Sequence, residues 1–367
     1  MIFFVLVLLL ICFSGVQMAK PNEFQKDYIS RDNTAWVKGI FVILILFSHG
    51  KSYIELGGVY DDPYTMMQNH LNQMVVAMFL FYSGYGIMEQ IKKREFAYIK
   101  SIPMKRFPNL LLNYDIAVIL FVFVNWYLGT QVTLKKFLLS LVAWDAIGNS
   151  AWYIFVILAL YVITFVAFFP IKWVKKPWFK VVSLLAVTAL SVALVYALMV
   201  VGKHKVWYNT LILYVFGMWY SFFKAKLEKL LMKNDFLYFL ILGIVFTVYV
   251  LSFRKRWDGI EIYTVWALCF TTIAVMFTMK VQIKSRVLDW FGNHVFSIYI
   301  LQRIPMMIFI SMPFFQYHKY LFLIASYVAV IPLALAYDWA TGKLTKLIWG
   351  RKKKSTVATP APVEEKA

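Results

Sequence analysis

Long apolar runs, separated by short polar segments, make up most of this chain of 367 residues. Such runs are typical of membrane-spanning helices, because about 20 apolar residues cross the hydrocarbon core of a bilayer. Eleven spans are predicted, near residues 2–17, 36–50, 72–91, 110–129, 151–170, 180–201, 207–223, 236–253, 262–279, 293–312 and 320–340. The pattern predicts an all-α, polytopic membrane helix bundle of about eleven transmembrane helices, with a ten-helix core and an N-terminal apolar helix.

The same pattern divides the chain into three parts. An N-terminal hydrophobic helix is expected at residues 1–19, a membrane domain at 20–349 and a tail at 350–367. No basic residue precedes Lys20, as one would in a signal peptide, so we expect an uncleaved anchor with its N-terminus outside. The tail is polar and rich in Pro and Ala, a composition that predicts disorder.

Loop charges predict the orientation of the bundle. If residues 18–35 are cytoplasmic, the loops on that side and the C-terminal end hold 26 Lys and Arg residues, and the opposite loops hold nine. Basic residues concentrate on the cytoplasmic side of membrane proteins. The sequence therefore predicts a multi-pass protein of the cell membrane, in bacteria the inner membrane, with a cytoplasmic C-terminus.

Composition supports a membrane protein and excludes other classes. The chain is 62% hydrophobic and 19% aromatic, with a mean hydropathy of +0.69. Its net charge of +20 lies mainly in short loops and forms no aromatic-interleaved basic domain, so no nucleic-acid partner is expected. The two cysteines, Cys12 and Cys269, fall in apolar spans and cannot build a disulfide framework or a metal site.

Two ionisable residues interrupt the apolar run of the 36–50 span. Lys38 and His49 are eleven positions apart, which in a helix is three turns plus about 20°, so both project from one face roughly 16 Å apart. Ionisable groups inside a membrane are costly and usually mark a site or a watery cavity. Lys38 alone is also explained by its amine reaching the headgroups, but the pair on one face favours function.

A basic residue, ten intervening residues and a histidine on the first core helix resemble the acyltransferase-3 family of integral membrane O-acyltransferases. The segment WVKGIFVILILFSHG is similar to the opening segment of that family. Lys38 stands where the family usually has Arg, so a bidentate grip on phosphate is replaced by a point charge. The resemblance implies that His49 and Lys38 are the catalytic pair.

Two further segments carry the resemblance near the expected cytoplasmic side. Ser83, Gly84 and Tyr85 are similar to the Ser-Gly-aromatic end of a family helix, although small residues there also indicate close helix packing. Lys105 and Arg106 precede a proline where the family commonly has two arginines. The resemblance implies that Ser83, Tyr85, Lys105 and Arg106 bind the acyl donor, while plain positive-inside charge explains Arg106 equally well and is the favoured explanation for Lys105.

Four other residues are weaker site candidates. Trp152 resembles a family Trp-aromatic helix start, and aromatic residues at a membrane boundary are also common anchors. Tyr299 fits a late family segment in which Gln302 occupies the position of a histidine, and a glutamine cannot titrate. Asp115 lies just inside a span, where it is expected either to orient Lys38 or a loop arginine, or to be interfacial.

The resemblance implies a membrane O-acyltransferase that moves an acyl group, acetyl as the first expectation, from cytoplasmic acyl-CoA to a hydroxyl of an exported or lipid-linked carbohydrate. His49 would act as general base. Acyl-CoA is then a co-substrate, and no bound cofactor or metal is expected. A multi-span transporter or flippase for a glycolipid-like amphiphile remains the alternative, and an inactive acyltransferase-like scaffold is a third possibility.

Overall fold

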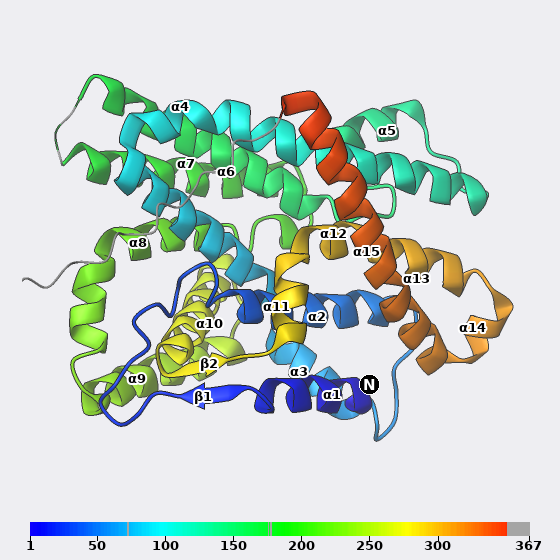
Figure 1. Ribbon diagram of the computed structural model, residues 1–367, viewed down its shortest axis with the longest axis horizontal. Helices are drawn as coiled ribbons and strands as arrows, with labels where there is room; N and C mark the ends of the chain where they lie inside the picture. The colour runs from blue at the N-terminus through cyan, green and yellow to red at the C-terminus, as the bar shows by residue number, and fades with distance from the viewer. Residues whose placement is uncertain (72, 175, 177, 351–367) are drawn as a thin grey trace, which may run out of the picture.

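The computed structural model describes residues 1–71, 73–174, 176 and 178–350, and its regular structure is almost entirely helical (Figure 1). The α-helices are α1 (Ile2–Phe13), α2 (Ala35–Lys51), α3 (Asp62–Leu71), α4 (Met74–Tyr127), α5 (Leu134–Leu141), α6 (Trp152–Phe168), α7 (Phe179–Val200), α8 (Ile212–Leu231), α9 (Asp235–Arg254), α10 (Ile260–Lys280), α11 (Arg286–Asn293), α12 (Val295–Leu301), α13 (Arg303–Ile310), α14 (Pro313–Tyr317) and α15 (Lys319–Trp349). Two short 3-10 helices, η1 (Phe169–Lys172) and η2 (Lys205–Trp207), and two antiparallel strands, β1 (Val16–Met18) and β2 (Val281–Ile283), complete the fold.

The helices confirm a polytopic membrane bundle. Within the described residues, six helical stretches are long and apolar enough to span a membrane, namely Asp62–Tyr127, Trp152–Lys172, Phe179–Val200, Asp235–Arg254, Ile260–Lys280 and Lys319–Ile348. The other predicted spans correspond to α1, α2, α8 and the pair α12–α13. At about 1.5 Å per residue, the 12 residues of α1 cover only about 18 Å, and the strand β1 continues the segment. The tail expected to be disordered lies, from residue 351 on, outside the described residues.

Helix α4 differs from the prediction of two spans joined by a loop. It is helical from Met74 to Tyr127 and passes through Pro103 and Pro108. The chain turns sharply at Glu95, where φ is 47° and ψ is −131°, so α4 consists of two arms (Figure 1). A positive φ is uncommon for a residue with a side chain and needs support from its surroundings. The Glu95 carboxylate accepts a 2.9 Å hydrogen bond from the amine of Lys180, which anchors the turn to the start of α7.

Helix α2, which carries both ionisable candidates, lies in the core of the bundle. Twelve of its 17 residues are buried, in keeping with a helix that is apolar on nearly every side. It contacts α4, α11, α12, α13 and α15. The crossing with α11 is so close that a Cβ on Gly39 would lie 2.0 Å from the carbonyl oxygen of Leu288, and one on Gly292 would lie 1.9 Å from that of Ala35. Because only glycine fits at both positions, α2 and α11 can pack with their backbones in contact.

A second close crossing joins the first arm of α4 to α8. A Cβ on Gly84 would lie 1.9 Å from the carbonyl oxygen of Tyr214, and one on Gly217 would lie 2.1 Å from that of Phe81. Small residues at such crossings let two membrane helices approach closely. Gly84 therefore serves close helix packing, the alternative role that its small size indicated.

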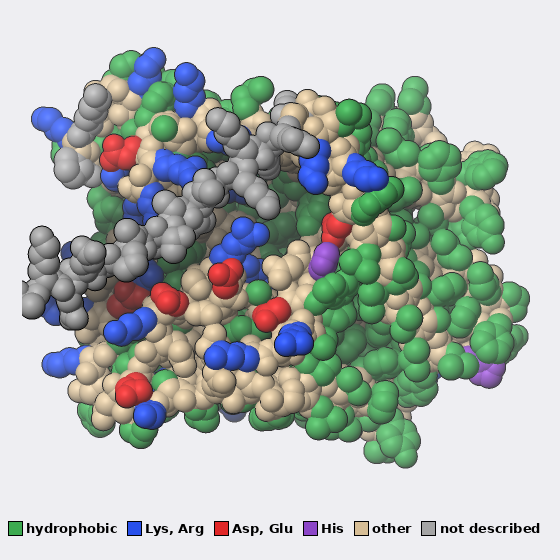
Figure 2. Space-filling view, viewed as in Figure 1, with side chains coloured by type: hydrophobic (Ala, Val, Ile, Leu, Met, Phe, Trp, Pro, Cys, Tyr) green, Lys and Arg blue, Asp and Glu red, His purple; other side chains and the backbone are tan. Residues whose placement is uncertain are grey.

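Contacts between distant segments join loops that the charge pattern assigns to the same side. Strand β1 pairs with β2, and Asp235 forms an ion pair with Lys280 near the same end of the bundle. At the other end, Asp61 pairs with Lys319 at 2.8 Å. Figure 2 shows Lys, Arg, Asp and Glu gathered on the left of the view, over α8, α9 and the turn of α4, while the right is mostly hydrophobic. The two ends of the bundle thus have different surface chemistry.

Candidate functional site

A cavity of about 910 Å³ lies between the start of α2, both arms of α4 and α6. No described lining residue is acidic. Five lining side chains are cationic, namely Arg31, Lys38, Arg94, Lys105 and Arg106. We call it the basic cavity. A site with several cations and no carboxylate favours a ligand that carries several negative charges.

The turn at Glu95 builds the basic cavity by bringing the two arms of α4 together. The first arm supplies Ser83 and Tyr85, and the second supplies Lys105 and Arg106. A guanidinium nitrogen of Arg106 donates a 3.0 Å hydrogen bond to the hydroxyl of Tyr98 on the same arm. This bond limits the movement of Arg106 and directs its remaining donors toward a ligand.

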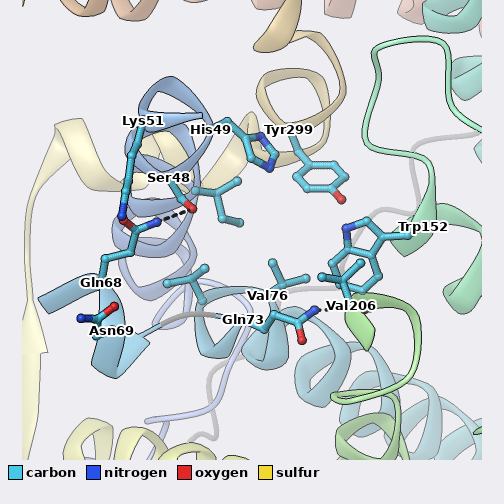
Figure 3. Close-up of a pocket in the computed structure, with 12 residues that line it drawn as sticks. Ser48, His49, Lys51, Gln68, Asn69, Gln73, Val76, Trp152, Val206 and Tyr299 are labelled. Atoms are coloured by element: carbon cyan, nitrogen blue, oxygen red, sulfur yellow. Dashed lines mark hydrogen bonds between the residues drawn. The ribbon is translucent and has the colours of Figure 1, made fainter. Parts of the chain in front are cut away.

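A second cavity, of about 300 Å³, surrounds the C-terminal turn of α2, and we call it the histidine cavity (Figure 3). Its polar lining comes from α2, α3, α6, α12 and the residue before α4, and comprises Ser48, His49, Lys51, Gln68, Asn69, Gln73, Trp152 and Tyr299. Hydroxyl, amide and indole groups of this kind exchange hydrogen bonds with sugar hydroxyls as readily as with water. The chemistry of this cavity is therefore polar and, apart from Lys51 and His49, uncharged.

His49 and Tyr299 face each other in the histidine cavity (Figure 3). Their ring centroids lie 6.5 Å apart. The Nδ1 atom of His49 and the hydroxyl of Tyr299 are buried and have no hydrogen-bond partner among the described residues. Leaving such groups unpaired costs about 1–3 kcal/mol each, so a polar ligand that reached either atom would gain a hydrogen bond. Arg303 lies close enough to His49 to interact with it electrostatically.

The amide side chains of the histidine cavity are held by the protein. Gln68 donates a 3.0 Å hydrogen bond from its amide to the hydroxyl of Ser48, shown as a dashed line in Figure 3. Gln73 donates a 3.0 Å bond to the carbonyl oxygen of Val206. The carbonyl oxygen of Gln68 remains available to accept from a hydroxyl group, since it has no partner among the described residues, whereas that of Gln73 accepts a 3.3 Å hydrogen bond from the Tyr263 hydroxyl.

Lys38 and His49 lie on the same helix but line different cavities. Lys38 lines the basic cavity and His49 the histidine cavity. Their separation of eleven residues is about 16 Å along the helix axis. One atom of substrate cannot touch both side chains, so any joint action requires an extended ligand.

The structure brings most of the predicted residues together in two groups. Lys38, Ser83, Tyr85, Lys105 and Arg106 meet in the basic cavity. His49, Trp152 and Tyr299 meet in the histidine cavity. The roles of these residues stay predictions, but their grouping is that expected for one donor site and one acceptor site.

Two predicted residues lie outside both cavities. Asp115 is on the second arm of α4, and its Oδ1 atom is buried without a partner among the described residues. The expected pairing of Asp115 with Lys38 is not formed among them. Gln302 is completely buried at the break between α12 and α13 and donates a 3.0 Å hydrogen bond to the carbonyl oxygen of Tyr299. Its amide therefore supports the backbone that carries Tyr299.

Sequence reasoning missed several lining residues. Arg31 and Arg94 line the basic cavity, but in the sequence they are part of ordinary loop charge. Gln68, Asn69 and Gln73 line the histidine cavity, and only the fold of α3 against α2 brings them there. For Arg31 and Arg94, the only signal in the sequence was their positive charge at the expected cytoplasmic side. Nothing in the sequence pointed to the three amide side chains. No group of three or more His, Cys, Asp or Glu side chains in the described residues could hold a metal ion.

Comparison with known proteins identifies the family. A family model described as an acyltransferase domain, acyltransferase-3, matches residues 33–339, which contain the lining of the histidine cavity and, apart from Ile29 and Arg31, that of the basic cavity. No curated protein and no solved structure matches the chain. Since the match extends over most of the chain and includes α2 with Lys38 and His49, the protein belongs to the acyltransferase-3 family and is a membrane acyltransferase.

Proposed function

We propose that the protein is a membrane O-acyltransferase that takes an acyl group from acyl-CoA in the basic cavity and transfers it to a hydroxyl of an exported or lipid-linked carbohydrate in the histidine cavity. One observation carries this proposal. A cavity with five cations and no acidic side chain among its described lining residues lies at one end of α2, and a polar cavity with a histidine lies at the other. The 3′,5′-ADP part of acyl-CoA carries several phosphate charges, whereas a carbohydrate is rich in hydroxyl groups.

The orientation supports the same assignment. The excess of basic residues in the loops around the basic cavity favours a cytoplasmic location for that end, where acyl-CoA is made. The histidine cavity would then lie toward the outside, where an exported or lipid-linked glycan is found. In bacteria this membrane would be the inner membrane, and the C-terminus would be cytoplasmic.

His49 would serve as general base. Histidine ordinarily titrates near pH 6.5, so its neutral form can remove a proton at physiological pH. The acceptor oxygen would form a bond to the thioester carbonyl carbon as the C–S bond breaks, and the proton would pass through His49 to the departing CoA thiolate. Lys38 would hold a polar part of the donor, since it is too far from His49 to act on the same atom.

The test uses membranes that contain the protein, supplied with isotopically labelled acyl-CoA. Extracted glycans and lipids are scanned by mass spectrometry for an added acyl group. The wild type is expected to add one, and His49→Gln is expected to lower the rate about 10²- to 10⁴-fold, the usual contribution of a general base. The acylated species would also name the acceptor.

A matched histidine variant controls for expression and folding. His70 lies on α3, where its ring stacks on that of Phe253 with centroids 4.0 Å apart, and it lines neither cavity. His70→Gln is expected to transfer at the wild-type rate. Equal activity of His49→Gln and His70→Gln at equal expression would exclude His49 as the base. Failure of the wild type to acylate anything from several donors would leave transport of a glycolipid-like amphiphile as the function to test.

A further inference from the structure

A third cavity, of about 290 Å³, lies beside the histidine cavity between α4, α6 and α12. Five of its eight lining side chains are wholly apolar, and the other three carry one polar group each: the first are Val76, Phe79, Ile154, Val295 and Phe296, the others Tyr153, Asn293 and Tyr299. No Asp, Glu, Lys, Arg or His is among its described lining residues. We call it the apolar cavity. The donor phosphates would find no cationic partner among the described lining residues, and an apolar chain would contact mostly carbon there.

Shared residues connect the apolar cavity to the histidine cavity. Val76 and Tyr299 line both cavities. Tyr299 therefore lines the apolar cavity and also lies 6.5 Å from the His49 ring, measured between ring centroids. A group held at the His49 ring is thus separated from the apolar cavity by no more than the side chains that line both.

Tyr153 connects the apolar cavity to the basic cavity. It lines the apolar cavity and packs edge-on against Tyr299, with ring centroids 5.7 Å apart. Its phenol also lies close to Ser83, which lines the basic cavity. The apolar cavity thus adjoins both proposed binding sites, at the place where a thioester bound in one would meet a hydroxyl bound in the other.

We propose that the apolar cavity receives the hydrocarbon chain of the transferred acyl group, so that the protein is built for acyl chains longer than acetyl. This inference rests on the proposed acyl transfer and names its donor class. A water molecule occupies about 30 Å³ in the liquid, and a methylene group is of similar size, so 290 Å³ holds several methylenes. The thioester carbonyl would lie near Tyr299 and His49 while the chain extends among Phe79, Ile154 and Phe296.

Burial of the chain gives a measurable preference. Each methylene transferred from water into an apolar site improves binding roughly fourfold. A donor with four more methylenes than acetyl-CoA is therefore expected to have a higher kcat/KM by a factor on the order of 10². Beyond the capacity of the cavity the preference stops rising, so kcat/KM passes through a maximum as the chain lengthens.

The experiment compares acetyl-, butanoyl-, hexanoyl-, octanoyl- and dodecanoyl-CoA as labelled donors for membranes containing the protein. The measured quantity is the ratio of kcat/KM for hexanoyl-CoA to that for acetyl-CoA. A ratio taken within one variant does not depend on its expression or on the fraction that is folded. We expect a ratio above one for the wild type, lower by at least tenfold in Phe79→Trp, which fills the cavity.

Enlarging variants and a lipid-facing control complete the test. Phe79→Ala and Phe296→Ala are expected to shift the maximum to longer chains. Phe239 on α9 is 58% exposed and lines none of the three cavities, so Phe239→Trp is expected to keep the wild-type ratio. Two enlarging variants are included because either of them alone can fail to fold.

The outcomes separate this inference from the proposed function. If the wild type transfers acetyl and the ratio is the same in every Phe79 and Phe296 variant, acyl transfer stands and the acyl-chain assignment is wrong. A cavity occupied by a membrane lipid would give that same indifference to the donor chain. If the wild type transfers no acyl group from any of the five donors, the proposed function fails and this inference fails with it.

Discussion

Replacing Gly84 by alanine should pull apart the α4–α8 crossing that supports the basic cavity. The added methyl group would lie 1.9 Å from the carbonyl oxygen of Tyr214, whereas ordinary contacts begin at about 3.4 Å. The two helices would have to separate locally by about 1.5 Å, or their backbones would have to bend. Overpacking of this kind usually costs about 1–3 kcal/mol, and the obstacle here is backbone, which cannot rotate away.

The assay is thermal unfolding of the purified protein in detergent. Unfolding is monitored by light scattering or by the fluorescence of a dye that does not react with thiols. Gly86→Ala is the matched control, because no heavy atom lies within 4 Å of a Cβ at Gly86 on the same helix. We expect Gly84→Ala to unfold several degrees lower than the wild type and Gly86→Ala to unfold at the wild-type temperature. Equal melting of the two variants would refute the close crossing.

Three further predictions concern side chains at the two ends of the bundle. Lys38→Gln should raise the KM for acyl-CoA about 10- to 100-fold in steady-state kinetics, because a charge-assisted hydrogen bond contributes about 1.5–3 kcal/mol. Lys38→Arg keeps the charge and should have a KM near that of the wild type. An unchanged KM in Lys38→Gln would show that Lys38 does not bind the donor. Tyr299→Phe should melt like the wild type, since its hydroxyl bonds to no described residue, yet transfer about 2- to 10-fold more slowly if that hydroxyl contacts the substrate. Burial acts to raise the pKa of the Asp61 carboxyl, but hydrogen bonds from Lys319, the N-terminal ammonium, the Gly57 N–H and Tyr320 outweigh it and hold the pKa well below its usual range. This stabilisation is therefore complete above about pH 4, the pKa of the carboxyl in the unfolded chain, and is lost as the pH falls further. Asp61→Asn should lower the melting temperature between pH 5 and 8, and the melting temperature of the variant should depend less on pH below pH 4. A melting temperature of Asp61→Asn equal to that of the wild type at pH 7 would contradict the network.

The membrane spans could be predicted because each is a long and largely apolar run, a local property of the sequence. The turn of α4 could not. Its polar, proline-containing segment indicates a loop, yet the helix continues through Pro103 and Pro108 and changes direction at the single residue Glu95. The support for that turn comes from Lys180, which is distant in the sequence. Tertiary contacts of this kind leave no periodic signal.

The candidate site was predictable where helical spacing or family resemblance applied. Lys38 and His49 share a helix, so their separation follows from the sequence. Gln68 and Gln73 enter the histidine cavity only because α3 and the start of α4 fold against α2. Gln302 was a candidate only through its position in a family motif, and the hydrogen bond from its amide to the Tyr299 carbonyl oxygen could not be read from the sequence.

The central claim is that donor and acceptor meet from opposite ends of the bundle, and the sidedness of acyl transfer tests it most directly. Labelled acyl-CoA, which does not cross membranes, is added to inside-out and to right-side-out vesicles prepared from cells that make the protein. The account predicts labelled product in inside-out vesicles, where the basic cavity faces the added donor, and none in intact right-side-out vesicles until they are permeabilised. Labelling of intact right-side-out vesicles at an equal or higher rate would contradict it.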